Sequence, residues 1–305
     1  MTAIELQGLA ARDASRRLAV TTTEEKNRAL ETIARALTAR MGEVLSANEA
    51  DLAAGREAGL TQALLDRLAL SPARMEGIVE GVRQVAALPD PVGEVTRKDT
   101  LKSGLLLTRR RVPLGVIGII YEARPNVTVD AAVLCLKAGN AVILRGGKEA
   151  FRSNQALMSI MRDAVDAAGL PRDSLALVQD TSRDSARELM ELTDYLDVLI
   201  PRGGAGLIRS VTANAKVPVI RTGEGVCHIY VDAEADLDMA VRVLYNAKCS
   251  RPAVCNAAEC VLVSRAVAQR FLPMAKAALD EKNVELRGCP ETCAILGAGA
   301  VPATD

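Results

Sequence analysis

Apolar side chains recur at helical spacing along the first part of the chain. Between residues 22 and 41 they follow the period of an amphipathic helix, at Leu30, Ile33, Ala34, Leu37 and Met41. Thr22 and Glu25 precede this run with the spacing of a capping box, which marks a helix N-terminus. Ser46 and Glu49 repeat that spacing, so the sequence predicts further helix starts up to about residue 88.

A different pattern begins after LPDPVGE, residues 88–94, whose two prolines and glycine interrupt the helical spacing. Short apolar, β-rich runs then alternate with amphipathic helical stretches. The runs are LLLTRRRV, PLGVIGIIYEA, NAVILR, SLALVQD, LDVLI and VPVI, followed by a second set of VCHIYVD, ECVLV and VELRG. Such alternation predicts an α/β fold, with a parallel sheet and helices on both of its faces. The final GAGAVPATD is expected to be a loop.

Length and composition indicate a neutral globular protein. A chain of 305 residues suits two lobes, or one lobe with insertions. Lys plus Arg and Asp plus Glu are 38 each, so bulk charge favours neither nucleic acid nor a membrane surface as a partner. The three arginines at 109–111 are expected to lie on a solvated edge strand rather than a nucleic-acid patch. Without an apolar leader or a membrane-length apolar stretch, the protein is expected to be cytoplasmic.

Two glycine-rich turns stand between a predicted strand and a predicted helix. They are ILRGGKEA at residues 143–150 and IPRGGAGLIR at residues 200–209. Glycine lets the backbone approach a phosphate, and a helix N-terminus is electropositive. Each turn alone is a weak signal, because neither matches the dinucleotide fingerprint or the P-loop spacing. Two such turns at strand ends of one sheet favour a nucleotide site.

The seven cysteines are expected to be mostly free thiols, because their number is odd and they are scattered through a long chain. Cys249, Cys255 and Cys260 lack the paired spacing of a zinc site. Cys135 and Cys260 lie in apolar runs and are interpreted as small buried hydrophobes. Cys255 follows Pro252 in a polar loop with Arg251 nearby, where a thiolate would be favoured. Since most free cysteines are structural, the residues alone leave its role open.

Several blocks of the chain closely resemble the gamma-glutamyl phosphate reductase family, a branch of the aldehyde dehydrogenase superfamily. The blocks are RRRVPLGVIGIIYEARPNVTVDAAVLCLKAGNAVILRGGKEAFRSN, VLIPRGGAGLI, TGEGVCHIYVDAEAD and NAKCSRPAVCNAAECVLV. The resemblance implies an aldehyde dehydrogenase-like fold with a Rossmann-like, NADP-binding domain at 1–90 and 113–224. A small β extension used in oligomerisation would be residues 91–112, and an α/β catalytic domain would be residues 225–305.

The resemblance also implies an enzyme, an NADP-dependent glutamate-5-semialdehyde dehydrogenase of proline biosynthesis. L-Glutamyl 5-phosphate would be reduced by NADPH through a thioester on Cys255. Asn126 would donate to the developing oxyanion. Losing one such donor typically lowers the rate about 10²- to 10³-fold. Lowering a thiol pKa by about 1.5 units raises the fraction of thiolate at neutral pH only about fifteenfold. Asn126 is therefore expected to matter more than Arg251.

The remaining site residues follow from the same resemblance. The adenosine ribose would be held by Arg145, Gly146, Gly147 and Lys148, and the pyrophosphate by Gly203 and Gly204. Two cations at the ribose end favour NADP over NAD. The substrate would contact Arg124, Arg251 and Asn256, and no metal is implied. As partners, the resemblance implies other copies of this chain in a homo-oligomer and, through functional coupling, glutamate 5-kinase.

Two departures from the superfamily affect these expectations. Hydrolytic aldehyde dehydrogenases carry a glutamate base near the position of Arg221. A reductase must not hydrolyse its thioester, so the loss of this base is consistent with a reductase. Glu224 stands three residues further on. Family members also continue past the position of Asp305, so the catalytic domain is expected to be truncated. The alternative function is a weakly active or non-catalytic NADP-binding remnant. A thiol-based redox or metal protein is a third alternative, which the cysteine spacing disfavours.

Overall fold

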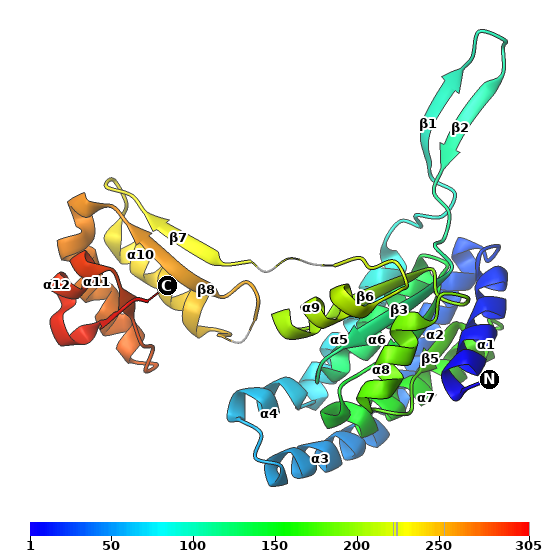
Figure 1. Ribbon diagram of the computed structural model, residues 1–305, viewed down its shortest axis with the longest axis horizontal. Coiled ribbons are helices and arrows are strands. Elements are labelled where there is room, and N and C mark those ends of the chain that lie inside the picture. The colour runs from blue at the N-terminus through cyan, green and yellow to red at the C-terminus, as the bar shows by residue number, and fades with distance from the viewer. Residues whose placement is uncertain (222, 224, 253, 305) are drawn as a thin grey trace. The chain divides into compact units, whose positions relative to one another are not determined.

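The computed structural model describes residues 1–221, 223, 225–252 and 254–304. The chain divides into two compact units, Met1–Thr222 and Gly223–Asp305, and each is described by itself. Figure 1 shows the elements of both units. Within the described residues, none of the helices combines the length and the apolar character that a membrane crossing requires. The assignment of cofactor binding and catalysis to separate parts of the chain stays a prediction.

Five helices open the first unit: α1 (Ala3–Leu18), α2 (Thr23–Ala39), α3 (Met41–Glu57), α4 (Gln62–Leu68) and α5 (Pro72–Ala87). The capping box at the start of α2 is confirmed, because Thr22 and Glu25 each bond the other's backbone N–H. The second expected helix start is wrong, since α3 runs through Ser46 without a break. Val44, Asn48 and Asp51 form a buried face on either side of Ser46, and packing along this face continues the helix.

Residues after the proline break form a two-stranded ribbon. Strands β1 (Val95–Thr100) and β2 (Leu106–Arg110) pair antiparallel with each other and with no other described strand. Every residue of β2 is exposed, including Arg109 and Arg110. The arginines are therefore solvated, as a strand that resists unwanted pairing requires.

A four-stranded parallel sheet forms the centre of the first unit. Its strands are β3 (Val116–Tyr121), β4 (Ala141–Arg145), β5 (Leu175–Leu177) and β6 (Val198–Arg202), in the order β5-β4-β3-β6. The predicted parallel α/β sheet is thus confirmed. The run VPVI is not a strand, because only Val219 forms an isolated bridge, with Leu199. Pro218 has no N–H to donate and so cannot extend this ladder.

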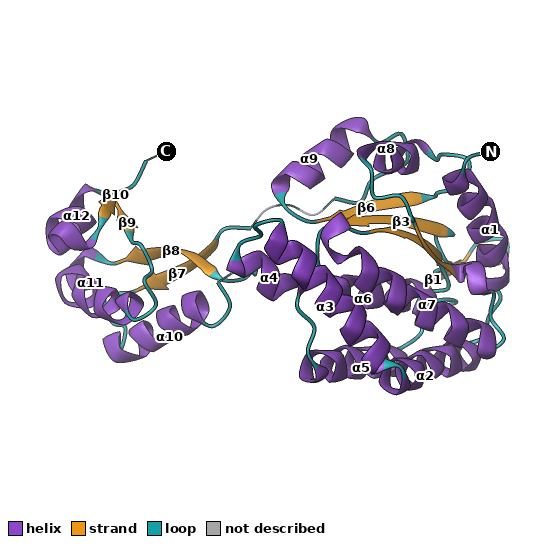
Figure 2. Cartoon of the chain, turned by 90° about the horizontal axis from the view of Figure 1, so that it is seen from below, coloured by secondary structure: helices purple, strands orange, loops and turns teal. Residues whose placement is uncertain are grey.

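Helices cover both faces of this sheet. In Figure 2, α8 (Arg183–Glu191) and α9 (Ala205–Asn214) lie over one face, and α6 (Pro125–Lys137) and α7 (Phe151–Ala167) lie over the other. Because the helix after β3 and the helix after β6 go to opposite faces, the carboxyl ends of these two strands form a topological switch point of the sheet. In open α/β sheets, ligands bind at such a topological switch point.

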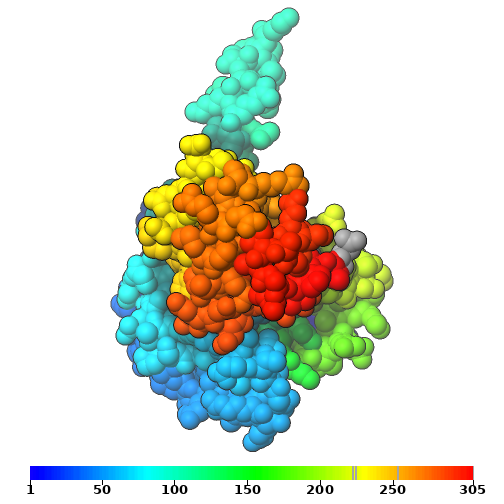
Figure 3. Space-filling model, turned by 90° about the vertical axis from the view of Figure 1, so that its left-hand side faces the viewer, coloured from blue at the N-terminus to red at the C-terminus, as the bar shows by residue number. Residues whose placement is uncertain are grey.

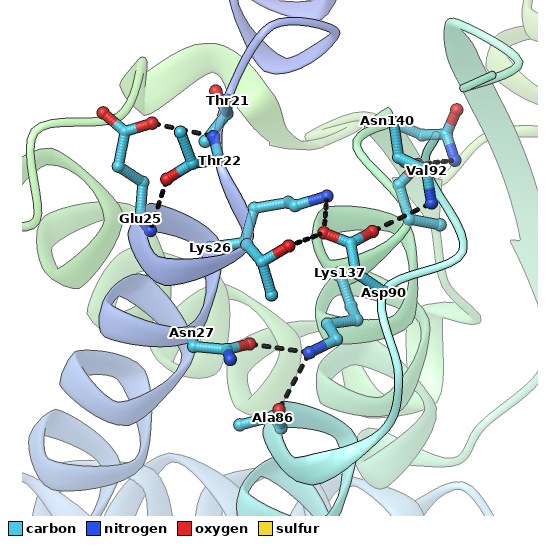
Figure 4. A network of polar contacts seen from close by, with 12 residues as sticks. Thr21, Thr22, Glu25, Lys26, Asn27, Ala86, Asp90, Val92, Lys137 and Asn140 are labelled. Atoms are coloured by element: carbon cyan, nitrogen blue, oxygen red, sulfur yellow. Dashed lines mark hydrogen bonds and ion pairs between the residues drawn. The ribbon is translucent and has the colours of Figure 1, made fainter. Parts of the chain in front are cut away.

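A buried ion pair joins α2 to the segment that follows α5 (Figure 4). Lys26 is fully buried, and its Nζ lies 2.6 Å from Asp90 Oδ2. Asp90 also accepts hydrogen bonds from Thr23 Oγ1 at 2.7 Å and from the backbone N–H of Val92 at 2.9 Å. On α6, Lys137 Nζ donates to the carbonyl of Ala86 at 2.8 Å. These contacts fix the chain between the helices and the β1–β2 ribbon.

The second unit is smaller. Strands β7 (Cys227–Val231) and β8 (Ala258–Val263) pair in parallel, and helices α10 (Leu237–Cys249) and α11 (Arg265–Asp280) pack against them. Figure 3 shows α11 in orange beside α12 (Pro290–Leu296) in red. The expectation of a terminal loop is wrong in part, because β10 (Val301–Pro302) pairs in parallel with β9 (Arg287–Gly288). That pairing joins distant segments, and so it leaves no local pattern in the sequence.

Candidate active site

Three of the four parallel strands lead directly into candidate site residues. Two of them lead into the glycine turns selected from the sequence. Strand β3 is followed by Glu122, β4 by Gly146 and Gly147, and β6 by Gly203 and Gly204. Parallel strands bring their carboxyl ends to one edge of the sheet, so both predicted glycine turns lie at the same edge.

The turn after β4 rests on a buried chain of hydrogen bonds. Tyr121 Oη lies 2.7 Å from Thr128 Oγ1, which donates to Asn154 Oδ1 at 2.8 Å. A Cβ at position 146 would lie 3.0 Å from the Tyr121 ring and would collide with Asn154. Burial raises the pKa of Tyr121, which therefore stays a neutral hydrogen-bonding group. Gly146 is required because these buried groups leave no room for a side chain.

The two cations near this turn lie in different surroundings. Arg145 is half-buried, and its guanidinium donates to the carbonyls of Thr181 at 2.7 Å and Ser182 at 2.8 Å. Burial lowers the pKa of Arg145, and the charge of Asp180 acts in the opposite direction. Lys148, in the short 3-10 helix Lys148–Ala150, is exposed. Lys148 is thus the cation that a solute could reach most directly, and Asp180 is an acid at this edge that the sequence analysis missed.

The turn after β6 already binds a carboxylate. The backbone N–H of Gly204, the N-cap residue of α9, donates to Glu122 Oε1 at 3.0 Å. A Cβ at position 203 would lie 2.7 Å from Glu122 Cδ, so Gly203 makes room for this side chain. The electropositive end of a helix suits an anion. The sequence analysis did not select Glu122, although an acid directly after a buried strand was a usable signal.

Residues from the ARPN segment form the start of α6. Arg124 is its N-cap residue, Pro125 is its first residue, and Asn126 lies in its first turn. Asn126 Nδ2 donates to Asp130 Oδ2 at 3.0 Å, which orients the amide. An amide nitrogen carries two N–H groups, so this contact leaves Asn126 one further donor hydrogen.

Cys255 lies in the second unit, in the loop between α10 and β8. Its side chain is exposed, as are Arg251 and Asn256. Cys227 Sγ donates to the carbonyl of Cys255 at 3.5 Å, and Ala257 N–H donates to the carbonyl of Val254 at 3.1 Å. Within the described residues of this loop, these contacts are a thiol–carbonyl contact and a backbone turn.

Residues 250–257, between α10 and β8, are called the thiol loop below. A shallow cavity of about 460 Å³ adjoins this loop. Arg251 and Asn256 both line it, together with Asn246 and Ser250 at the end of α10. The structure thus brings together two of the three predicted substrate residues. Arg124 belongs to the first unit, as do Asn126 and both glycine turns. Glu224 lies outside the described residues, and so does Ala253 within the thiol loop.

The other thiols differ from Cys255 in their surroundings. Cys135 is buried, and desolvation raises its pKa to about 12, which keeps it protonated. Cys260 is only half-buried, which corrects the expectation of a buried hydrophobe. Cys289 is exposed, and hydrogen bonds from Thr292 lower the pKa of its thiol. Among the described residues, no group of three or more His, Cys, Asp or Glu could hold a metal ion.

Comparison with known proteins identifies the family to which these features belong. The model of the aldehyde dehydrogenase family matches residues 3–292. The chain belongs to the aldehyde dehydrogenase family, whose α/β fold it shares.

Within that family the chain is similar to gamma-glutamyl phosphate reductases. It is 55% identical to the one from Heliobacterium modesticaldum over 302 residues, which are 99% of this chain and 72% of the relative. It is 58% identical to the one from Moorella thermoacetica over 293 residues, 96% of this chain and 70% of the relative. The crystal structure of the Thermotoga maritima enzyme superposes with a TM-score of 0.89 at 45% identity, covering 98% of this chain and 72% of that one.

Proposed function

We propose that this protein reduces L-glutamyl 5-phosphate to L-glutamate 5-semialdehyde with NADPH and releases phosphate, as a step of proline biosynthesis. The observation that carries the proposal is identity of 55% to a gamma-glutamyl phosphate reductase over 99% of the chain. An exposed thiol on a polar loop and two glycine turns at one edge of the parallel sheet support the proposal.

In the first step, the thiolate of Cys255 attacks the acyl carbon of the substrate. A bond forms between sulfur and carbon, and the bond between carbon and the phosphate oxygen breaks. Phosphate leaves with the electron pair, and Cys255 carries the glutamyl group as a thioester. Exposure supports this role, because an exposed thiolate keeps its hydration and can meet a soluble substrate.

In the second step, the thioester carbon is reduced. The nicotinamide cofactor supplies the hydride. The carbonyl oxygen becomes an oxyanion, which collapses to the aldehyde as the carbon–sulfur bond breaks and the thiolate of Cys255 is restored. The oxyanion needs preorganised donors, and we assign this role to the side-chain N–H of Asn126 and the backbone N–H of Cys255.

In this proposal the dinucleotide binds at the switch point between β3 and β6, at the sheet edge where both glycine turns lie. At Gly146 and Gly203 a Cβ would collide with Asn154 and with Glu122, so both turns keep a bare glycine backbone beside the proposed cofactor. Gly147 and Gly204 adjoin them, and we assign the diphosphate to the N-terminus of α9 and the adenosine ribose to Arg145 and Lys148. NADP is preferred over NAD in this proposal because Lys148 offers an exposed cation to a 2′-phosphate.

Arg124, Arg251 and Asn256 are assigned to the substrate. The two arginines offer charge-assisted hydrogen bonds to the phosphate and the carboxylate of glutamyl phosphate. Arg221 stands where hydrolytic relatives have a glutamate base. A cation there does not activate water, so the thioester survives until it is reduced.

The reverse reaction tests the proposal directly. Purified protein is given glutamate 5-semialdehyde, NADP and phosphate, and the absorbance of NADPH is followed. We expect NADPH to form only when phosphate is present, because the thioester must be released by phosphate and not by water. NADPH binding without turnover would favour the alternative of a non-catalytic NADP-binding protein. Turnover without phosphate would contradict the proposed reaction.

We also propose that the β1–β2 ribbon pairs this chain with another copy. Leu105, Leu106 and Leu107 are 63%, 61% and 52% exposed, which is a large apolar surface for a solvated hairpin. Light scattering on the purified protein should give an oligomer, and Leu106→Lys should shift it toward the monomer. Functional coupling to glutamate 5-kinase is proposed because an acyl phosphate is unstable in water.

A further inference from the structure

The carboxylate of Glu122 lies where the proposed function places the diphosphate of the cofactor. Glu122 directly follows β3, and Gly204 directly precedes α9, a helix of ten residues. Glu122 Oε1 accepts the N–H of Gly204 at 3.0 Å. This N–H is one of the donors that a helix N-terminus offers to a phosphate.

The position of Glu122 is set by the surrounding backbone. Its N–H donates to the carbonyl of Arg202 on β6 at 3.4 Å, and its carbonyl accepts the N–H of Arg124 at 2.7 Å. A Cβ at position 203 would lie 2.9 Å from both Glu122 Cγ and Glu122 Oε1. Only glycine at position 203 therefore leaves space for the carboxylate against the turn.

A carboxylate and a diphosphate cannot both occupy this place. Each needs the same backbone N–H, and both are anions, so they repel each other at short range. We propose that Glu122 is an internal competitor for the cofactor: its carboxylate caps α9 in the free protein and leaves when the diphosphate binds. This inference rests on the proposed function, whose cofactor it concerns.

The competition has a measurable consequence. A protein whose binding site is partly occupied by its own side chain binds a ligand more weakly, in proportion to the fraction of open sites. Glu122→Gln keeps the size of the side chain and removes its charge, so it weakens the cap and abolishes the repulsion. We expect NADPH to bind about tenfold more tightly to this variant. The gain should appear mainly as faster association of the cofactor, because a larger fraction of sites is open in the free protein.

The experiment is a titration of the purified protein with NADPH, followed by cofactor fluorescence. Glu191→Gln is the matched control, because it makes the same charge change at the far end of α8, where Glu191 pairs with Lys216 at 3.4 Å. Adenosine 2′-monophosphate is the second ligand, since it has the ribose phosphate but no diphosphate. Glu122→Ala, which removes the carboxylate entirely, checks that a gain does not depend on the glutamine amide.

Tighter NADPH binding in Glu122→Gln and Glu122→Ala, with unchanged affinity for adenosine 2′-monophosphate, supports the competition. Equal gains for both ligands would overturn it, because they would indicate only a general effect of charge. Unchanged or weaker NADPH binding would also overturn it while leaving the proposed function intact. If neither the wild type nor any variant binds NADPH, the proposed cofactor itself is wrong.

Discussion

The glycine-lined edge of the first unit and the thiol loop of the second are built in opposite ways. Every residue of β3 is buried, and the turn after β4 rests on the buried Tyr121, Thr128 and Asn154. The thiol loop precedes β8. This strand pairs with β7, in which half-buried and exposed positions alternate before the buried Val231. The loop itself depends on contacts such as the 3.5 Å bond from Cys227 Sγ to the carbonyl of Cys255. In our proposal, stability and cofactor binding therefore depend on the same residues in the first unit, whereas in the second unit the proposed nucleophile can be changed with little effect on stability.

Replacing the thiol should give the largest effect on activity with almost none on stability. We expect Cys255→Ser to reduce the rate of NADPH formation on the order of 10⁴-fold or more, because the proposed nucleophile is lost. The free energy of unfolding should change by less than about 0.5 kcal/mol, since the side chain is exposed. Steady-state kinetics and urea denaturation of the same preparation measure both quantities.

Cys289→Ser is the control for this variant. Cys289 is also exposed, and its thiol pKa is lowered by hydrogen bonds from Thr292. Both Cys255 and Cys289 should therefore be alkylated quickly by iodoacetamide, and labelling alone does not identify the nucleophile. Loss of turnover in Cys289→Ser with retention in Cys255→Ser would reverse the assignment.

The buried ion pair of the first unit should show the opposite behaviour, with a large loss of stability. Asp90→Asn leaves the charge of fully buried Lys26 without its carboxylate partner. Breaking a buried pair typically costs about 3–5 kcal/mol in the free energy of unfolding. Urea denaturation measures this loss, and the double variant Lys26→Met with Asp90→Asn should recover part of it because no unpaired charge remains.

The same pair predicts a pH dependence. Desolvation raises the pKa of Asp90, but hydrogen bonds from Lys26, Thr23 and the backbone of Val92 outweigh it and leave this pKa lowered. A carboxyl whose pKa is lower in the folded state stabilises the protein above its unfolded value of about 3.9, and this contribution is lost as the pH falls through the folded value. Asp90→Asn should therefore show a weaker loss of stability on acidification than the wild type. An equally steep loss would contradict this role of Asp90.

The parts of the fold that could be predicted from sequence are those with a local pattern. The runs NAVILR and LDVLI became buried parallel strands, and the capping box of Thr22 opened a helix, because period and capping act within a few residues. The helix start predicted at Ser46 was wrong because packing along the buried face of α3 continues the helix through this capping-box spacing. Glu122 and Asp180 were missed because their importance arises from contacts with Gly204 and Arg145, which are distant in sequence.

Removing the proposed oxyanion donor should give an intermediate effect on activity. Asn126→Ala is expected to lower kcat about 10²- to 10³-fold, with little change in the dissociation constant of NADPH. Asp130→Asn is the matched test, because Asp130 accepts the side-chain N–H of Asn126 at 3.0 Å and orients the amide. A loss confined to NADPH affinity would mean that Asn126 binds the cofactor instead.

The smallest expected effect separates the two cations beside the glycine edge. Arg145 donates to the carbonyls of Thr181 and Ser182, whereas Lys148 is exposed, so a 2′-phosphate would depend mainly on Lys148. Lys148→Ala should weaken NADPH binding about fivefold and leave NADH binding unchanged, because an exposed cation contributes on the order of 1 kcal/mol. The difference should shrink at high salt, where exposed charges are screened.

Lys102→Ala, which removes an exposed cation from the turn of the β1–β2 ribbon, is the control. Equal weakening of NADPH binding and NADH binding would show that Lys148 does not select the 2′-phosphate. Asp180 would then favour NAD at this edge, because an acid suits a ribose hydroxyl.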